Sequence, residues 1–243
     1  TVTVCDLAQR DMRCEATAVM GPQGRVFYVS GENVFVWTTR RGSDSGVFRI
    51  PLDGSAPSAL KVAGAPVDQF SFLESLDGHL NVLLRAEGQG DAMWDGARGR
   101  GDMALLRVPL ATFSDGRDSA PAGSYKPLPG GGGYGLQNRY VGPYLLYGNP
   151  GNPGRRKADQ AWPRQPLYAV RWADAGSVQA LSLPHGVERI EALGNDAVVI
   201  GAQGRDLHFS TIGLGGQAAV ATRYIRADAA QGESRSHGFF YKP

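Results

Sequence analysis

The sequence predicts an all-β protein. Short apolar segments, many of them alternating with polar residues, recur along the whole chain, and turn-forming residues separate them. The chain has 34 Gly and 15 Pro, yet 42% of its residues are hydrophobic, which is typical of a folded, turn-rich chain rather than a disordered one. No long amphipathic helical pattern interrupts the strands. These observations favour several antiparallel sheets of short strands.

A four-strand pattern recurs along the chain. Two short strands flank a tight turn, a third strand ends in Arg-apolar-Pro-Leu, and a turn leads to a fourth. Arg-Ile-Pro-Leu at 49–52 is matched by Arg-Val-Pro-Leu at 107–110. The copies span residues 25–63, 68–128, 137–183 and 187–225. Repetition of a four-strand unit is typical of a β-propeller, in which each unit forms one antiparallel blade.

The strands within each unit follow from apolar runs between turn residues. In the first unit, Val-Phe-Tyr-Val at 26–29 and Val-Phe-Val-Trp at 34–37 flank Ser30-Gly31-Glu32, and the aromatic and β-branched residues favour strands. Third strands are expected at 46–52, 102–110, 166–172 and 206–212, and fourth strands at 58–62, 124–128, 178–183 and 218–225. The segment Asp-Gly-Arg-Asp at 115–118 is interpreted as a turn.

The two ends of the chain complement each other. Residues 1–7 and 14–20 have the pattern of third and fourth strands, and residues 235–241 that of a first strand. A fifth blade shared between residues 1–20 and 234–243 would close the ring. We therefore expect residues 1–243 to form one five-bladed propeller domain, with a larger propeller as the alternative. Because this shared blade lacks a second strand, we also expect further residues beyond Pro243.

Cys5 and Cys14 are the only cysteines. Strand-like runs flank them, so they are predicted to pair across a hairpin. An isolated pair favours an exported protein, secreted or periplasmic, and two reduced thiols in a cytosolic chain are the alternative. No metal site is predicted, because two thiols without a nearby His leave a tetrahedral site half filled.

The charge balance and the hydropathy argue against nucleic acid and a membrane as partners. The 25 basic and 23 acidic residues give a net charge of +2 and are scattered, so nucleic acid is not expected. No segment reaches the ~18 consecutive apolar residues of a membrane span. We expect a monomer without a cofactor.

Residues 233–241, Glu-Ser-Arg-Ser-His-Gly-Phe-Phe-Tyr, resemble the final segment of bacterial secreted proteins with a C-terminal β-propeller domain. The aromatic-rich repeat at 70–84 is similar to that family as well. The resemblance implies secretion and a propeller. It implies no active-site residue, because the family carries no well-defined catalytic set.

Binding residues are expected in loops on one face of the propeller. Two connections from second to third strand, residues 86–101 and 148–164, are long, and they contain Trp94 and Trp162. Loops of this length are usually functional or disordered, and Trp is enriched at binding surfaces. The alternative is that each Trp folds back onto its own blade. Tyr134 follows a run of four glycines, which is either a close approach to a ligand or a slack linker.

Polar residues on the first strands form a second candidate group. Arg139, Arg235 and His237 fall on strands that would line the central channel. A polar, water-filled channel explains them without a ligand, and a small anion or a metal is the alternative. Only His237 of the four His falls in this layer, so three His converging on a metal are not expected.

Catalytic motifs are absent from the sequence. It contains no His-Glu-x-x-His, no Gly-x-Ser-x-Gly and no acidic calcium loop, so no catalytic residue is assigned. We expect a binding module that engages a protein, peptide or glycan through its long-loop face. The alternatives are a hydrolase or lyase acting on polysaccharide or peptide at the channel mouth, and an accessory domain of a larger enzyme.

Overall fold

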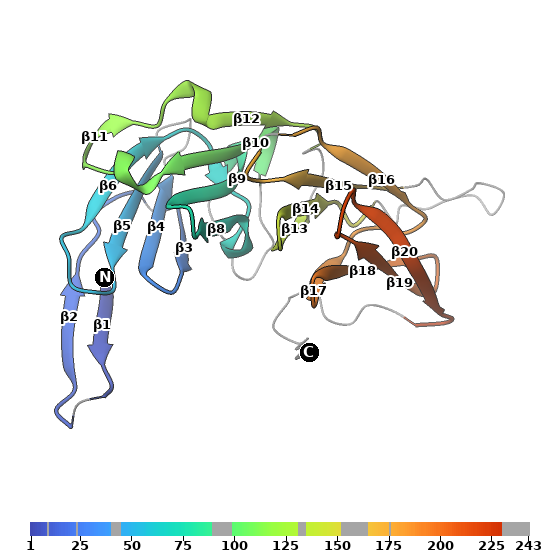
Figure 1. Cartoon of the computed structure of the whole chain (residues 1–243), viewed down its shortest axis with the longest axis horizontal. Coiled ribbons are helices and arrows are strands. Elements are labelled where there is room, and N and C mark those ends of the chain that lie inside the picture. The colour runs from blue at the N-terminus through green and yellow to red at the C-terminus, as the bar shows by residue number, and fades with distance from the viewer. Residues whose placement is uncertain are drawn as a thin grey trace. The chain divides into compact units, whose positions relative to one another are not determined.

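The computed structural model describes residues 1–8, 10–22, 24–39, 45–88, 99–130, 135–151, 165–174 and 176–229 (Figure 1). Within these residues the regular elements are β-strands and three short 3-10 turns, which confirms the all-β prediction. No helix in the described ranges is long and apolar enough to cross a membrane. The chain divides into two compact units, Thr1–Lys126 and Pro127–Pro243, which are described separately.

The first large sheet of the first unit has four antiparallel strands in chain order, with a fifth strand added at its outer edge. The four are β3 (Gly24–Val29), β4 (Asn33–Thr39), β5 (Ser45–Pro51) and β6 (Ser58–Val62). All seven residues of β4 are buried, because both faces of this strand are covered. The neighbouring edge strand β3 has three exposed residues, so the double coverage is limited to the middle of the sheet.

The second large sheet of the first unit is centred on a long hairpin. Its main strands are β9 (His79–Gly88), β10 (Gly99–Pro109) and β12 (Tyr125–Leu128). On the other side, β9 pairs with two short strands, β7 (Ala65–Pro66) and β8 (Phe72–Ser75). The 3-10 turn η1 (Gln69–Ser71) separates these two, and the Asp68 side chain caps it by accepting from the Phe70 N–H at 2.8 Å. The first strand of this repeat is thus interrupted.

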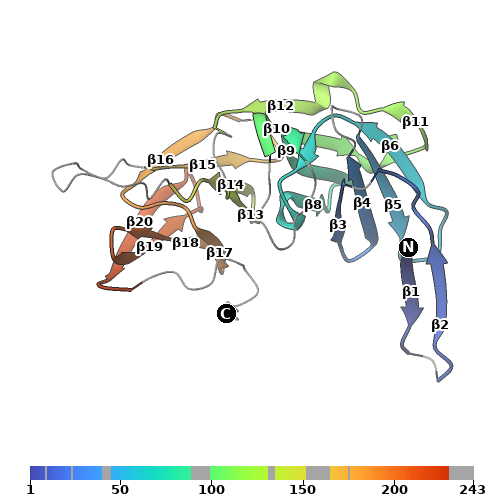
Figure 2. The same cartoon turned by 180° about the vertical axis from the view of Figure 1, so that it is seen from behind.

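The segment at 115–118 corrects one prediction, because it is a strand and not a turn. β11 (Asp115–Ser119) lies between the 3-10 turns η2 (Leu110–Thr112) and η3 (Ala122–Ser124). It pairs with β6 in parallel and so joins the second repeat to the outer edge of the first sheet (Figure 2). Its exposed side chains and Gly116, at φ +83°, hide the strand from pattern analysis.

The second unit contains two four-stranded antiparallel sheets, each in chain order. The first comprises β13 (Gln137–Val141), β14 (Tyr144–Gly148), β15 (Gln165–Arg171) and β16 (Gln179–Leu183). The second comprises β17 (Arg189–Leu193), β18 (Asp196–Gln203), β19 (Asp206–Gly213) and β20 (Ala219–Arg226). Both are simple meanders.

Each unit has its main core between its two large sheets. In the first unit, Phe35 and Trp37 of β4 pack in one cluster with Val82 of β9. The alternate residues Val34 and Val36 point to the opposite face and pack with β5 and with segments near the N-terminus. In the second unit, the corresponding core residues from β14 and β15 are Leu146, Leu167 and Ala169, and those from β18 and β19 are Val199 and Ile212.

The backbone approaches itself very closely in the second unit. A Cβ atom on Gly186 would lie 1.7 Å from the Pro150 carbonyl oxygen, and one on Gly201 would lie 1.8 Å from the Gly186 oxygen. Only glycine fits at either position. The segment after β16 is thereby held between the end of β14 and β18, where the Val187 N–H donates to the Asn149 oxygen at 2.8 Å.

A separate two-stranded hairpin begins the chain. β1 (Val2–Asp6) and β2 (Arg13–Thr17) pair antiparallel in this hairpin (Figure 1). Cys5 lies opposite Cys14, and the two cysteines form a disulfide. The predicted disulfide is therefore confirmed. Val2 packs against the outer face of the first sheet, near Val34 and Ile50. The shared fifth blade stays a prediction, since residues 234–243 lie outside the described residues.

Replacing both cysteines, Cys5→Ser with Cys14→Ser, tests how far the disulfide stabilises the hairpin. The disulfide closes a loop of about ten residues. Its removal should lower the free energy of unfolding of the hairpin by ~3 kcal/mol, because the unfolded chain gains conformational entropy. We expect faster amide hydrogen exchange in β1 and β2 and little change in the large sheets. Slow exchange in the variant hairpin, or free thiols in the native protein by mass spectrometry, would contradict this account.

Candidate functional site

The structure describes one of the six predicted binding residues. Trp94, Tyr134, Trp162, Arg235 and His237 lie outside the described residues, so their roles stay predictions.

The long connection predicted at 86–101 is shortened by strand pairing. β9 and β10 continue to the facing pair of Gly88 and Gly99, so only residues 89–98 lie outside the described part of the chain. The paired strands of this hairpin are therefore longer than the sequence predicted, and the connection between them is shorter.

The sixth residue, Arg139, lies on β13 and binds a carboxylate of the neighbouring sheet. Its Nη2 donates to Oε2 of Glu191 on β17, and Arg189 Nε donates to Glu191 Oε1 at 2.9 Å. The side chains of Glu191 and Arg189 are buried, and that of Arg139 is 22% exposed. One carboxylate thus receives two guanidinium groups and joins the first strands of two adjacent sheets. This favours the structural explanation of Arg139 over the ligand-binding one.

The first unit has a corresponding contact around Glu74. This residue on β8 accepts hydrogen bonds from the Ser30 hydroxyl and from the Asn33 side-chain amide of the preceding sheet. The Tyr28 ring stacks on Phe72 beside it, with ring centroids 5.5 Å apart. In both units, then, a carboxylate on or beside a first strand connects one sheet to the next.

The arginine of the repeated Arg-apolar-Pro-Leu motif has a definite partner. Arg49 Nε donates to Asn33 Oδ1 at 2.7 Å, and Arg107 Nη1 donates to Asn81 Oδ1 at 2.9 Å. Both asparagines lie on second strands and are fully buried, where an amide needs hydrogen-bond partners. The motif therefore satisfies a buried polar group in each of the first two repeats.

A buried histidine and serine meet in the second unit. His185 Nδ1 lies 2.7 Å from the Gly186 carbonyl oxygen, and its Nε2 lies 2.8 Å from Ser210 Oγ. Because a carbonyl only accepts, Nδ1 carries the proton and Nε2 accepts from the Ser210 hydroxyl. The His208 ring stacks on His185 with centroids 5.3 Å apart, and Arg223 of β20 faces Ser210 in register.

A serine hydroxyl on a histidine is the arrangement of a nucleophile and its base. However, Ser210 is 0% exposed and His185 1%, so a substrate has no access to the pair. Burial lowers the pKa of His185 to about 4 and also lowers the pKa of His208. The cluster is therefore a neutral polar element of the core. Sequence analysis missed it because the two residues are 25 positions apart.

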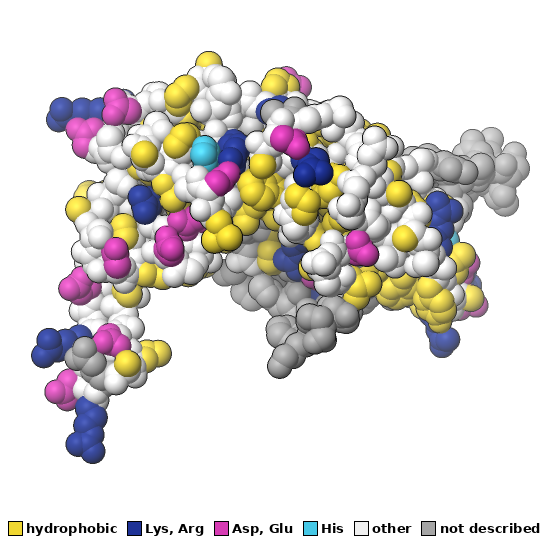
Figure 3. All heavy atoms as spheres, viewed as in Figure 1, with side chains coloured by type: hydrophobic (Ala, Val, Ile, Leu, Met, Phe, Trp, Pro, Cys, Tyr) yellow, Lys and Arg dark blue, Asp and Glu magenta, His cyan; other side chains and the backbone are white. Residues whose placement is uncertain are grey.

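An open groove of about 350 Å³ lies between the N-terminal hairpin and the connection from β5 to β6. Asp6, Arg13 and Glu15 line it on the hairpin side, and residues 50–57 line it on the other. The volume is within the range of ligand pockets. Figure 3 shows basic and acidic side chains intermixed on the hairpin. The charged groups Asp6, Arg13 and Glu15 are exposed to water.

No group of three or more His, Cys, Asp or Glu suited to holding a metal occurs among the residues that the structure describes. The sequence matches no protein-family model and no curated protein. The resemblance to secreted propeller proteins therefore stays a prediction, and a functional assignment rests on the geometry above.

The buried His185 predicts acid sensitivity of the second unit. Its folded pKa of about 4 lies below its unfolded value of 6.5, so the unfolded chain takes up the proton first as the pH falls. The contribution of neutral His185 to the free energy of unfolding is complete above pH ~6.5. It decreases toward pH 4, by about 3 kcal/mol in total. Urea unfolding followed by circular dichroism at several pH values measures this.

The comparison variant is His185→Gln, which should lose this component of the pH dependence. His79→Gln, at the partly exposed start of β9, is the control for removing a histidine outside the core, and its pH dependence is measured in parallel. An identical pH dependence in the native protein and in His185→Gln would contradict the interpretation.

Proposed function

We propose that this chain is an exported β-propeller that acts as a binding module for a protein, peptide or glycan partner. Each of the four large sheets is one blade in this proposal. The β1–β2 hairpin and residues 234–243 contribute to a fifth. The disulfide between Cys5 and Cys14 supports export, because such bonds persist in oxidising compartments.

The observation that carries the propeller is the contact from a carboxylate on a first strand to the preceding sheet. Blades of a propeller are arranged radially, so the first strands of neighbouring blades converge around the channel. Glu191 joins β17 to β13 in the second unit, and Glu74 joins β8 to the β3–β4 turn in the first. In both pairs of sheets a carboxylate on a first strand reaches the preceding sheet, at its first strand in the second unit and at its first hairpin in the first unit. This recurrence supports one repeated radial arrangement.

Binding is favoured over catalysis because the inner polar groups are engaged by one another. Arg139 and Arg189 bind Glu191, and His185 and Ser210 bond to each other inside the core. The partner is proposed to contact the long-loop face, where Trp94 and Trp162 supply large amphipathic side chains. Tyr134, Arg235 and His237 are proposed to line the adjoining channel mouth.

The double variant Trp94→Ala with Trp162→Ala tests the binding face. Loss of a central Trp anchor costs about 2 kcal/mol or more, which is about 30-fold in affinity. The immobilised chain is offered a glycan array and a periplasmic extract, and bound species are quantified. We expect the double variant to lose every ligand that the native chain retains.

Trp172→Phe is the matched control, since Trp172 donates to the Gly142 oxygen at 2.9 Å beside the β13–β14 turn and lies away from both long connections in sequence. It should retain the ligands. Retention of the same ligands by the double variant would show that the long connections do not form the binding face.

A further inference from the structure

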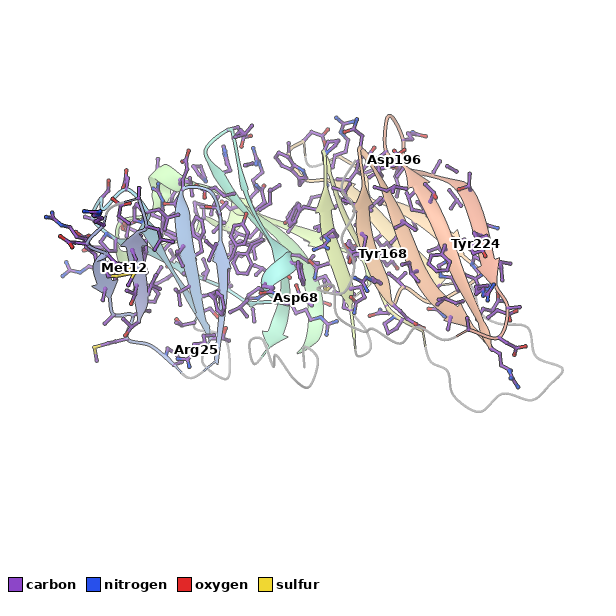
Figure 4. The ribbon with its side chains drawn as sticks, turned by 90° about the horizontal axis from the view of Figure 1, so that it is seen from below. Met12, Arg25, Asp68, Tyr168, Asp196 and Tyr224 are labelled. Atoms are coloured by element: carbon purple, nitrogen blue, oxygen red, sulfur yellow. A yellow bond between two sulfur atoms is a disulfide. The ribbon has the colours of Figure 1, made fainter. Side chains whose placement is uncertain are left out.

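The outer edge of β20 is an open strand edge, longer than the fourth strands β6, β12 and β16 of the other described sheets. β20 is the last strand of its sheet and spans eight residues, all of them exposed except the half-buried Val220. Its two largest apolar side chains, Tyr224 and Ile225, are 60% and 53% exposed. Figure 4 shows Tyr224 on this last strand. Among the described residues, no strand pairs with this edge.

An open edge presents unpaired backbone N–H and C=O groups that can accept another strand. The sequence of β20, Ala-Val-Ala-Thr-Arg-Tyr-Ile-Arg, is rich in strand-forming residues. Its pairing with β19 is regular from Leu207 to Thr211, and the one register shift lies at the far end, between Thr211 and Ile212. The edge is therefore a suitable template over most of its length.

The same edge is occupied in another sheet of this chain. β6 is the fourth strand of its sheet, as β20 is of its own, and β11 is added to it in parallel. Backbone hydrogen bonds hold this addition, from Ala59 N to Ser114 O at 2.9 Å and from Ala120 N to Lys61 O at 2.8 Å. The added strand is acidic, with two Asp and one Arg, and the strand that receives it carries Lys61.

The charges on β20 indicate which strand it receives. It carries Arg223 and Arg226 and no acidic residue. A second copy of β20 would place arginines against arginines, and the chain's own residues 230–243 contain one Glu against one Arg and one Lys. Neither is an acidic strand. An acidic segment from another protein complements the edge.

We propose that the outer edge of β20 binds an extended acidic peptide segment of a partner protein by strand addition. The backbone groups of the edge provide the hydrogen bonds, and Arg223 and Arg226 select acidic side chains. The two arginines are three positions apart and therefore point to opposite faces of the sheet. The preferred peptide accordingly carries acids three positions apart. This site uses neither Trp94 nor Trp162, so it stands or fails separately from the long-loop face.

The probe is the blocked heptapeptide Thr-Glu-Val-Thr-Glu-Val-Thr, titrated into the isotope-labelled full chain and followed by NMR. We expect saturable shifts centred on residues 219–226 and slower hydrogen exchange of their amides. Arg223→Glu with Arg226→Glu should weaken binding about tenfold or more, which is about 1.4 kcal/mol. The control is Arg10→Glu with Arg117→Glu, an equal charge change on exposed arginines of the first unit, and should change affinity less than about twofold.

A second peptide separates strand addition from simple charge attraction. Thr-Glu-Pro-Thr-Glu-Pro-Thr has the same charge but lacks two N–H donors. Its affinity should be lower by at least about tenfold. Equal binding of the two peptides would overturn the proposal, as would unchanged affinity in the Arg223→Glu, Arg226→Glu variant. A native dimer in sedimentation equilibrium that this variant dissociates would assign the edge to a second copy instead.

Discussion

The packing of one sheet on the next within each unit, joined by a carboxylate on a first strand, is the interaction on which the structure depends. A sheet whose strands carry apolar residues on both faces needs a neighbour on each side. β4, with every residue buried, is the clearest case. Glu74 and Glu191 each bind donors of the preceding sheet, and the buried Glu191 is tolerated only because donors surround it.

The close packing has consequences for the residues that it traps. Gly186 and Gly201 have no space for a side chain, and burial lowers the pKa of His185 beside them, whose ring is positioned by its bonds to Gly186 and Ser210. These groups specify one arrangement of the segment after β16. His185 and Ser210 are bonded to each other in the core, so the proposed binding surfaces are sought among exposed loops and edges.

The strands were predictable because their cause is local. A continuous apolar run between turn residues identifies a strand such as β4 within a short window. The partners of Arg139 and Glu74 were not predictable, since they lie 52 and 44 residues away and depend on which sheets meet. β11 escaped detection because its stability comes from the edge of β6 rather than from its own apolar pattern. For the candidate site, the sequence identified residue types suited to binding but not their contacts. For Arg139 the structure adds the contact with Glu191.

Small-angle X-ray scattering of the full chain tests the central claim most directly, namely that the sheets form one radial array of blades. A single compact domain of this length has a radius of gyration of about 18 Å. The account predicts that value and a pair-distance distribution with one maximum. A radius several ångströms larger, with two maxima from two separate bodies, would contradict the propeller and leave two independent pairs of sheets.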